Sequence, residues 1–490
     1  MKKIFSYAVA LAFMSVVMYG CKLVSSEYSD ISSDLYPTSE RDARDLVTSN
    51  VYEAFRNDEY AGAFNVATGF HLLGDMATDF GFCSWGESNW GQLEYANFQN
   101  PDGARNPRMN WAPYLPWISK MELTIDRIKG IAMDETLKKR YLAELECGQG
   151  FMAFLIWDFY GPIILSDLET LKKPQDEIIL PRQTNEQTIA YIESKLKAAA
   201  EAGVLAKSYS KENADYGRFT EGLCHTLLLK LYMQTKQWPK AIVEGRELMK
   251  PEYSYELVTD AGDAGSAYAN VFSSANEGNK ETIWAVNCLR EYQSHLWYPH
   301  VISWGGYKMT RIFFETFESG DDRCAPNVIT DGGSSQGVLP LKYDMVNRTS
   351  DNCYTDWIVY RYADVITLLA EAIVQQGNAV TQEAIDLLNE VRTRASLPPY
   401  QMSSFTNKDD FIDKLLWERA HELWYEGCRR QDLIRNNKYV TTMAQKCVDH
   451  GRTDYITALG TNAHLFPLPS SAVNEGRKGG FNYQNPGYGD

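Results

Sequence analysis

The sequence lacks most of the short motifs by which enzymes and metal sites are identified. Its 490 residues contain no P-loop, no G-x-G-x-x-G, no H-E-x-x-H and no C-x-x-C. The seven histidines are dispersed, and His295 and His300, five residues apart, do not stack on one face of a helix. These absences argue against a nucleotide-binding enzyme, a zinc site and a redox dithiol. We therefore expect no cofactor and no bound metal.

Positive charge and paired cysteines are also scarce. Lysine and arginine number 48 against 64 aspartate and glutamate residues, which gives a formal net charge of -16 at pH 7. Because binding to phosphates needs surfaces rich in lysine and arginine, nucleic acid is not expected as a partner. The nine cysteines are scattered, and we expect most of them to be buried free thiols.

Long apolar runs are lacking except at the N-terminus. Two lysines precede an apolar run from Ile4 to Tyr19, and Cys21 follows it. A basic start, a short apolar core and a cysteine directly after the cut are typical of a bacterial lipoprotein signal peptide, and the run is short for a transmembrane helix. We expect a signal peptide over 1–20, a lipid on Cys21 and a flexible polar tether over 21–37. The alternative is an ordinary secreted protein whose cysteine falls there by chance.

Helical periodicity dominates the rest of the chain. Thr184 and Gln187 form a capping-box pattern ahead of an apolar stripe at helical spacing. Tyr232 and Ala241 lie nine residues apart in a helix pair, as the large and small packing residues of a tetratricopeptide repeat do. The pattern predicts a mostly α fold built on such helix pairs. We expect helices over 135–160, 189–199, 223–232, 239–249, 357–376, 382–395 and 408–425.

Three long stretches interrupt this pattern, at 74–118, 251–356 and 437–490. They are rich in glycine, asparagine and tryptophan and contain short β-like pieces such as 281–288. Irregular loops of such length are uncommon in a compact domain and usually serve a function. We expect a rigid helical frame that carries long irregular loops and a few short strands.

Aromatic residues are abundant, with 12 tryptophans and 30 tyrosines. A flat ring can cover the C–H face of a sugar while polar neighbours bind its hydroxyl groups. Most of these rings belong to the core, but two groups lie outside helical stripes and are candidates for a ligand-binding surface, with a purely structural role as the alternative. The first group is Trp85, Trp90 and Tyr95, and the second is Tyr292, Trp297, Tyr298, Trp304 and Tyr307.

Acidic residues leave a glycosidase open, because such an enzyme needs only two carboxylates about 5–10 Å apart. Glu418 and Glu422 lie four residues apart on one predicted helix, but three arginines are close to them in the sequence. We interpret this segment as a structural salt-bridge network. The Asp-Asp-Arg sequence at 321–323, after a glycine, predicts a turn with a capping cluster.

Four segments of the chain, in order, resemble the SusD/RagB family of outer-membrane lipoproteins. They are YLAELECGQGFMAFLIWDFYGPIIL, then VYRYADVITLLAEA with LLNEVRTRASLP, then WERAHELWYEGCRRQDLIR, and finally HLFPLPSSAVNEGRKGGFNYQNPGY. The resemblance implies a single SusD-like domain over 38–490, with an N-terminal part at about 38–250 and a C-terminal part at about 251–490. It also implies four tetratricopeptide-like helix pairs and an irregular ligand-binding face.

The same resemblance implies a function without catalysis. Such proteins are lipid-anchored in the outer membrane at the cell surface, capture oligosaccharides or polysaccharides, and deliver them to a SusC-like TonB-dependent transporter. In starch-binding relatives a T-D…W…N segment forms part of the sugar platform, and Thr78, Asp79, Trp85 and Asn89 are placed similarly. The ligand-binding residues expected here are Asp79, Trp85, Asn89, Trp90, Tyr292, Trp297, Trp304 and Tyr307.

Two other functions remain as alternatives. A peptide or glycopeptide receptor of the same family would present a charged groove rather than an aromatic one. A helical glycoside hydrolase would place two carboxylates facing each other across a cleft. We expect the glycan-binding protein, with tryptophan rings as stacking platforms and with Asp79 and Asn89 as the residues that bind hydroxyl groups.

Overall fold

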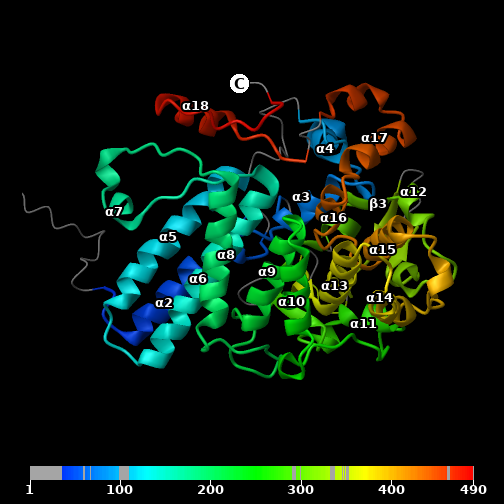
Figure 1. Cartoon of the computed structure of the whole chain (residues 1–490), viewed down its shortest axis with the longest axis horizontal. Helices are drawn as coiled ribbons and strands as arrows, with labels where there is room; N and C mark the ends of the chain where they lie inside the picture. The colour runs from blue at the N-terminus through cyan, green and yellow to red at the C-terminus, as the bar shows by residue number, and fades with distance from the viewer. Residues whose placement is uncertain are drawn as a thin grey trace, which may run out of the picture.

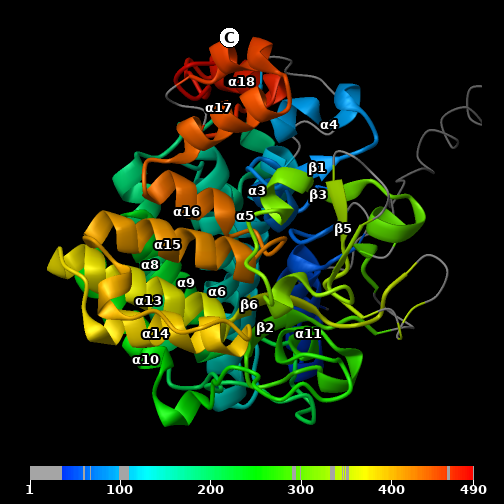
Figure 2. The same ribbon diagram turned by 90° about the vertical axis from the view of Figure 1, so that its right-hand side faces the viewer.

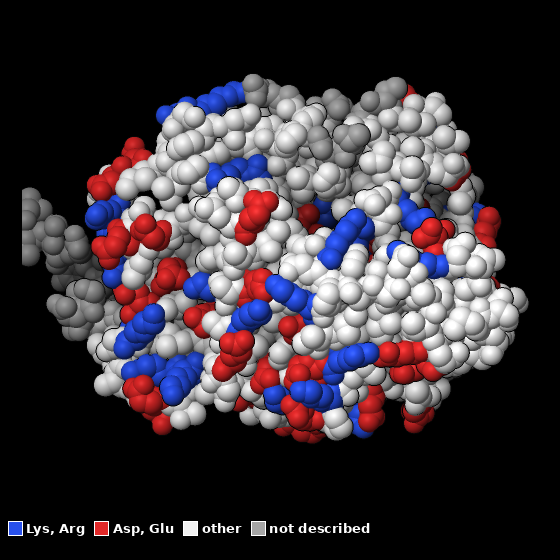
Figure 3. Space-filling model, in the orientation of Figure 1, with Lys and Arg blue, Asp and Glu red and all other residues white. Residues whose placement is uncertain are grey.

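The chain folds into a succession of helices (Figure 1) and carries several short strands. The computed structural model describes residues 36–58, 61–66, 68–98, 110–289, 294–297, 299–331, 337–344, 346, 348, 352–460 and 464–488. Among these residues, helices long and apolar enough to cross a bilayer are absent. On the face shown in Figure 3, basic and acidic side chains are interspersed over the helices, as on an ordinary solvated surface.

The helices of the scaffold pack on one another largely in chain order. Each helix contacts its neighbours in the succession α5–α6–α8–α9–α10–α13, and α13 also contacts α14 and α15. This arrangement confirms the predicted mostly α, tetratricopeptide-like scaffold. The bounds are α5 (Trp111–Lys129), α6 (Glu135–Tyr160), α8 (Asn185–Glu201), α9 (Glu221–Gln234), α10 (Trp238–Leu248), α13 (Tyr362–Gly377), α14 (Gln382–Arg394) and α15 (Lys408–Glu422).

Local sequence signals explain where several of these helices begin and how closely they pack. Gln187 N donates to Thr184 Oγ1 at 3.2 Å and Thr184 N donates to Gln187 Oε1 at 2.9 Å, which is the predicted capping box of α8. In the α9–α10 pair, Tyr232 and Ala241 are both buried. A Cβ on Gly245 would meet Leu369 Cβ at 3.1 Å, so the small residue lets α10 lie close to α13.

One predicted helix begins later than its periodicity indicated. Residues 357–361, expected as the first turn of a helix over 357–376, form strand β6 (Trp357–Arg361), and α13 starts only at Tyr362. Strand β6 pairs antiparallel with β2 (Thr282–Val286), which lies in the β-like piece predicted at 281–288. All five side chains of β6 are buried, so a run of aromatic and β-branched residues favours the strand.

The remaining strands form a small sheet of order β1-β3-β5-β4, with antiparallel pairs throughout. Figure 2 shows β1, β3 and β5 on the opposite side of the molecule from α13, α14 and α15. The strand bounds are β1 (Gly81–Cys83), β3 (Tyr307–Thr310), β4 (Ile329–Thr330) and β5 (Gly337–Pro340). The sheet thus lies within two of the stretches that were predicted to be irregular.

Short helices also occupy these stretches, so the prediction of long loops is wrong in part. The stretch 437–490 holds α17 (Tyr439–Asp449) and α18 (Ser470–Lys478). The other α-helices are α2 (Glu40–Asn50), α3 (Phe70–Met76), α4 (Glu87–Glu94), α7 (Leu168–Leu171), α11 (Ala267–Val271), α12 (Arg311–Phe314) and α16 (Arg429–Arg435). Short 3-10 elements are η1 (Tyr52–Phe55), η3 (Pro174–Asp176), η4 (Pro251–Tyr253), η5 (Ser274–Asn276), η7 (Asp322–Cys324), η8 (Met402–Ser404) and η9 (Thr453–Ala458), and η6 (Pro299–Ser303) is a π-turn.

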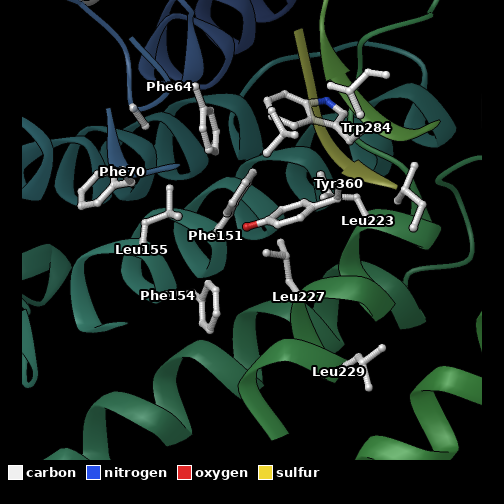
Figure 4. Packing of buried hydrophobic residues seen from close by; sticks show 14 of the residues in the cluster. Phe64, Phe70, Phe151, Phe154, Leu155, Leu223, Leu227, Leu229, Trp284 and Tyr360 are labelled. Carbon is white, nitrogen blue, oxygen red and sulfur yellow. The ribbon is translucent and has the colours of Figure 1, made fainter. Parts of the chain in front are cut away.

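Aromatic rings at the centre of the core join the two halves of the chain (Figure 4). Phe151 of α6 lies 4.7 Å from the Phe55 ring and 5.7 Å from the rings of Trp284 and Tyr360, measured between centroids. Trp284 also lies 5.5 Å from Phe219. These contacts bury rings from the N-terminal helices against β2 and β6, so both halves contribute to one buried cluster.

The cysteines that the structure describes agree with the prediction of mostly buried free thiols. Burial raises the pKa of the Cys147 and Cys288 thiols, which keeps them protonated at neutral pH. Cys324 is partly buried, and the free and buried cysteines are Cys83, Cys147, Cys224, Cys288, Cys353, Cys428 and Cys447.

Candidate functional site

The pairing of β1 with β3 brings together two aromatic segments that lie more than 200 residues apart. Cys83 pairs with Tyr307 in the ladder. The pairing continues beyond it, because Ser84 N donates to Gly306 O at 2.9 Å and Ser84 Oγ donates to Gly305 O at 2.6 Å. The residues that follow β1 therefore lie beside the residues that precede β3.

Trp85 and Trp304 form an aromatic patch at this junction. Their ring centroids are 6.2 Å apart, with the ring planes at 48°. Trp85 Nε1 donates a hydrogen bond to Trp304 O at 3.1 Å, which holds the first indole against the backbone of the second segment. Trp304 keeps 47% of its surface exposed and Trp85 is partly exposed. The two rings are thus held in place yet accessible to a ligand.

Three buried rings form a support layer beneath the patch: Trp90, His300 and Tyr307. The His300 ring stacks on Tyr307 at 4.9 Å and lies 4.7 Å from Trp304. The centroid of the Trp85 ring lies 6.3 Å from that of Trp90 and 5.4 Å from that of Tyr307. Tyr307 Oη donates to Val66 O at 2.5 Å, which ties the layer to the N-terminal part of the chain. Packed rings of this kind restrict the orientation of the exposed indoles.

Gly306 makes the close approach of Trp85 possible. A Cβ at this position would lie 2.1 Å from Trp85 Cε2, which is far inside van der Waals contact. Sequence reasoning missed both Gly306 and His300. The available signal was their position, since His300 lies between two tryptophans of the second aromatic group and Gly306 directly precedes the strand that carries Tyr307.

Three of the predicted ligand-binding residues are buried, two of them predicted stacking platforms. Trp90 is 1% exposed, Trp297 is 2% exposed and Tyr307 is fully buried, so none of these rings offers a face to solvent. Trp297 belongs to a different part of the core, where its ring lies 5.3 Å from Tyr425 and 5.8 Å from Trp357. The prediction that these three residues contact ligand is therefore wrong, and Trp90 and Tyr307 support the patch from below.

Other predicted residues lie elsewhere or outside the described part of the chain. Asp79 accepts two hydrogen bonds from Arg429, at 3.0 Å from Nε and 2.6 Å from Nη2, and it lines a cavity next to α17 that does not include Trp85 or Trp304. The backbone of Asn89 belongs to α4, but its side chain is not among the described groups. Tyr292 and Cys21 are also outside the described residues.

Comparison with known proteins relates the chain to one family. The family model of the SusD family matches residues 314–488. The SusD-like protein P38 of Formosa agariphila is 25% identical over 418 residues, which cover 72% of this chain and 80% of that protein. Residues 314–488 thus match the SusD family, and the chain is similar to a SusD-like protein over most of its length.

Solved structures of SusD-like proteins share this fold. A SusD homolog from Bacteroides thetaiotaomicron superposes with a TM-score of 0.75 at 20% identity, over 93% of this chain and 98% of that one. The surface glycan-binding protein A from the same organism, solved in complex with laminarihexaose, superposes with a TM-score of 0.71 at 18% identity, over 89% of this chain and 98% of that one. At such identity the likeness establishes the fold alone.

The acidic residues of the SusD-like segment around α15 are engaged in a buried ionic network. Arg361 Nη1 donates to Glu281 at 2.6 Å and to Glu422 at 2.5 Å, and Arg361 Nε donates to Glu426 at 2.7 Å. Burial by itself raises the pKa of Glu422, but Arg394, Arg361 and Arg323 outweigh it and lower the pKa to about 2. Glu422 is therefore ionised, and its Oε1 accepts hydrogen bonds from Arg361 and Arg394, as expected of a structural residue.

The network confirms the interpretation of Glu418 and Glu422 as structural residues. Glu418 accepts from Arg323 at 2.5 Å and from Arg392 at 3.0 Å, and both glutamates are buried. The predicted turn at 321–323 is also present, since Asp321 caps η7 and its carboxylate binds the Arg323 guanidinium. Within the described residues, no group of three or more His, Cys, Asp or Glu side chains is placed to hold a metal ion.

Proposed function

We propose that this SusD-like protein is a non-catalytic glycan-binding protein and that the aromatic patch of Trp85 and Trp304 holds sugar rings. The single observation that carries the proposal is the partly exposed indole pair, which the β1–β3 pairing and the support layer orient. A relative of the same fold was solved in complex with laminarihexaose, which supports an oligosaccharide as the class of ligand.

The energetics fit weak and reversible capture. A sugar that covers roughly half an indole buries about 100 Å² and gains about 2 kcal/mol, at about 25 cal/mol per Å². Two such contacts give about 4 kcal/mol before the cost of ordering the glycan, which corresponds to a Kd of about 1 mM or weaker. Such an affinity suits a protein that has to release its ligand again.

Titration calorimetry against a panel of neutral oligosaccharides that includes laminarihexaose tests the proposal. Trp304→Ala should weaken binding about tenfold, because it removes most of one stacking contact. The double variant Trp85→Ala/Trp304→Ala should abolish measurable binding. Trp117→Ala is the matched control, because this partly exposed tryptophan lies on α5 of the scaffold.

Two results would count against the proposal. One is the absence of saturable binding to every oligosaccharide in the panel by the unmodified protein. The other is an unchanged Kd for the double variant, which would leave glycan binding without a link to this patch. Thermal unfolding curves that match the curve of the unmodified protein show that the variants are folded.

The two alternative functions have less support. A peptide receptor would need a charged groove, whereas the aromatic patch presents the indole rings of Trp85 and Trp304 to the solvent. A glycoside hydrolase needs an accessible carboxylate pair, and Glu418 and Glu422 are buried and paired with arginines. Release of reducing ends from a polysaccharide incubated with the protein would favour the hydrolase and overturn the non-catalytic assignment.

Similarity to the SusD family also supports a partner and a location. We propose that the protein is anchored by a lipid on Cys21 at the cell surface and delivers glycan to a SusC-like TonB-dependent transporter. Copurification of such a transporter with the full chain from detergent-solubilised outer membranes checks the partner. Loss of the protein from the membrane fraction in a Cys21→Ser variant checks the anchor, and retention in that fraction would contradict it.

A further inference from the structure

A cavity that neither Trp85 nor Trp304 lines is a further candidate site. It is a cavity of about 290 Å³ between α12, α15, α16 and α17, and we call it the α17 cavity. One face of α17 forms a wall, because Thr441, Gln445 and Asp449 follow one another at the four-residue spacing that aligns side chains on a helix. The volume is near the lower end of the range for small-ligand sites.

An exposed indole forms the apolar wall of the α17 cavity. Trp417 of α15 has 41% of its surface exposed, although the Arg429 guanidinium lies 5.0 Å from its ring centroid. The Phe313 ring packs against it at 6.0 Å with 32° between the planes. Ile312, which is also exposed, extends the apolar surface. The indole is held on one side and open on the other.

Polar groups line the rest of the cavity. Gln445 Nε2 donates to Asp449 Oδ1 at 2.7 Å, and Thr442 adds a hydroxyl group to the same wall. On the opposite side Asp79 and Arg429 form the ion pair described above. Amide, hydroxyl and carboxylate groups around an aromatic face are the chemistry that binds the hydroxyl groups and the C–H face of a sugar.

The charges of the cavity cancel. Arg429 is paired with Asp79, and the positive charge of Lys446 balances the negative charge of Asp449. Lys446 Nζ also donates to Thr78 O at 2.6 Å and to Gly81 O at 2.7 Å. Burial lowers the pKa of His450, which leaves its ring uncharged at neutral pH. A phosphate, a uronate or a cation would therefore gain little electrostatic binding energy in this cavity, whereas the binding of a neutral polar ring does not depend on a net charge.

We propose that the α17 cavity is a binding site for one neutral, hydroxyl-rich sugar ring. Trp417 covers the C–H face of the ring, and Gln445, Asp449 and Thr442 bind its hydroxyl groups. The site goes beyond the proposed function, since it uses neither Trp85 nor Trp304. It also gives Asp79 a place at a ligand site other than the one that the sequence predicted.

Fluorine NMR of protein labelled with 5-fluorotryptophan reads both sites at once. Trp417→Phe and Trp304→Phe each remove one resonance and so assign it. The probes are methyl glycosides of glucose, galactose and mannose, titrated to about 50 mM to reach weak affinities, with glucuronic acid as the charged comparison. We expect a saturable shift of the Trp417 resonance with at least one neutral glycoside and a smaller shift with glucuronic acid.

Variants on α17 connect that shift to the cavity. Gln445→Ala should raise the Kd measured from the Trp417 fluorine resonance about 3–10-fold, because one or two neutral hydrogen bonds to the sugar are lost. Val448→Ala is the matched control, because Val448 is exposed on the same helix but does not line the cavity. If Gln445→Ala fails to fold, Thr442→Val provides the same test with a smaller change.

The outcomes separate this proposal from the proposed function. A Trp417 resonance that none of the glycosides moves overturns the α17 cavity, even if Trp304 responds. An unchanged Kd in Gln445→Ala, or equal affinity for glucuronic acid, overturns it as well. A response of Trp417 without a response of Trp304 supports the cavity and counts against the aromatic patch.

Discussion

The carboxyl group of Asp75 is buried in α3, beside the turn between α15 and α16. It accepts hydrogen bonds from Gly427 N at 2.6 Å and from Arg429 N at 3.4 Å. Burial nevertheless raises the pKa of Asp75 to about 8, and the backbone donors and Lys342 offset it only in part. The folded protein therefore holds a proton here at neutral pH.

This proton makes the free energy of unfolding depend on pH. The carboxyl of an unfolded aspartate has a pKa of about 3.9, so between about pH 4 and about pH 8 the folded state binds a proton that the unfolded state lacks. The contribution is fully present below the unfolded pKa and is lost as the pH rises toward the folded pKa. Asp75 therefore lowers stability progressively across this range.

We expect Asp75→Asn to flatten this dependence, because the amide stays uncharged at every pH. Its advantage in unfolding free energy over the unmodified protein should grow from about pH 5 to about pH 8 and reach about 2–4 kcal/mol. Thermal unfolding followed by circular dichroism at several pH values measures it. Asp263→Asn is the control, since Asp263 is exposed. Parallel pH profiles for Asp75→Asn and the unmodified protein would contradict the expectation.

At the scale of single elements, the positions of the helices were predicted well and the burial of the side chains was not. The helices α6, α8, α9, α10 and α14 start and end within a few residues of their predicted bounds, because caps and apolar periodicity act within one segment. The first strand residues of β6 were misjudged, since only the partner strand β2 makes them extended. The exposure of Trp85 and Trp304 likewise depends on a distant segment, because the pairing of β1 with β3 places them.

Gly306 provides a test of that pairing. In Gly306→Ala the new Cβ would meet the Trp85 ring, so the indole has to leave its position against β3. We expect the Trp85 resonance of the fluorotryptophan-labelled protein to shift or broaden, and glycan affinity to fall about tenfold as it would for a lost stacking contact. Fluorine spectra and titration calorimetry measure the two effects.

The neighbouring glycine supplies the control. Gly305 has a φ of 62°, and a Cβ added there would have nothing within 4 Å. Gly305→Asn therefore places a side chain in open space, at a backbone conformation that asparagine tolerates. It should leave the Trp85 resonance in place. An undisturbed Trp85 in Gly306→Ala would show that the close approach of ring and backbone does not restrict this residue.

At the scale of the whole molecule, the two halves of the chain depend on each other. Phe151 and Phe219 from the N-terminal part pack on Trp284 and Tyr360, and α10 packs on α13. Removing residues 251–490 would expose these surfaces to water, which costs about 25 cal/mol for each Å² of apolar area. Rings and helix faces that have lost their partners do not form a stable core on their own.

We therefore expect a fragment of residues 38–250 not to fold into a defined structure. Its near-ultraviolet circular dichroism should be weak, whereas the chain from residue 22 to residue 490 should show a strong signal and one cooperative unfolding transition. A fragment with a sharp transition of its own would show that the N-terminal part is an independent domain. The chain from residue 22 to residue 490, unfolded under the same conditions, is the reference.

What the sequence by itself determined is local or carried by motifs. The capping box of α8, the helix pair with Tyr232 and Ala241, and the acidic residues next to arginines all led to correct predictions. Each depends on residues close together in the chain, or on segments that resemble the SusD family as a whole. The mostly α scaffold followed from these signals.

Only the tertiary structure decided which aromatic and acidic side chains a ligand can reach. Trp90 and Tyr307 lie next to Trp85 and Trp304 but below them, and Asp79 pairs with Arg429, 350 residues further along the chain. Burial and ion pairing depend on which distant segments meet. The hydrophobic periodicity of a sequence indicates only which side chains share a face of a helix or strand. The burial of each aromatic ring therefore depends on how β1, β3 and the helices around α16 pack together.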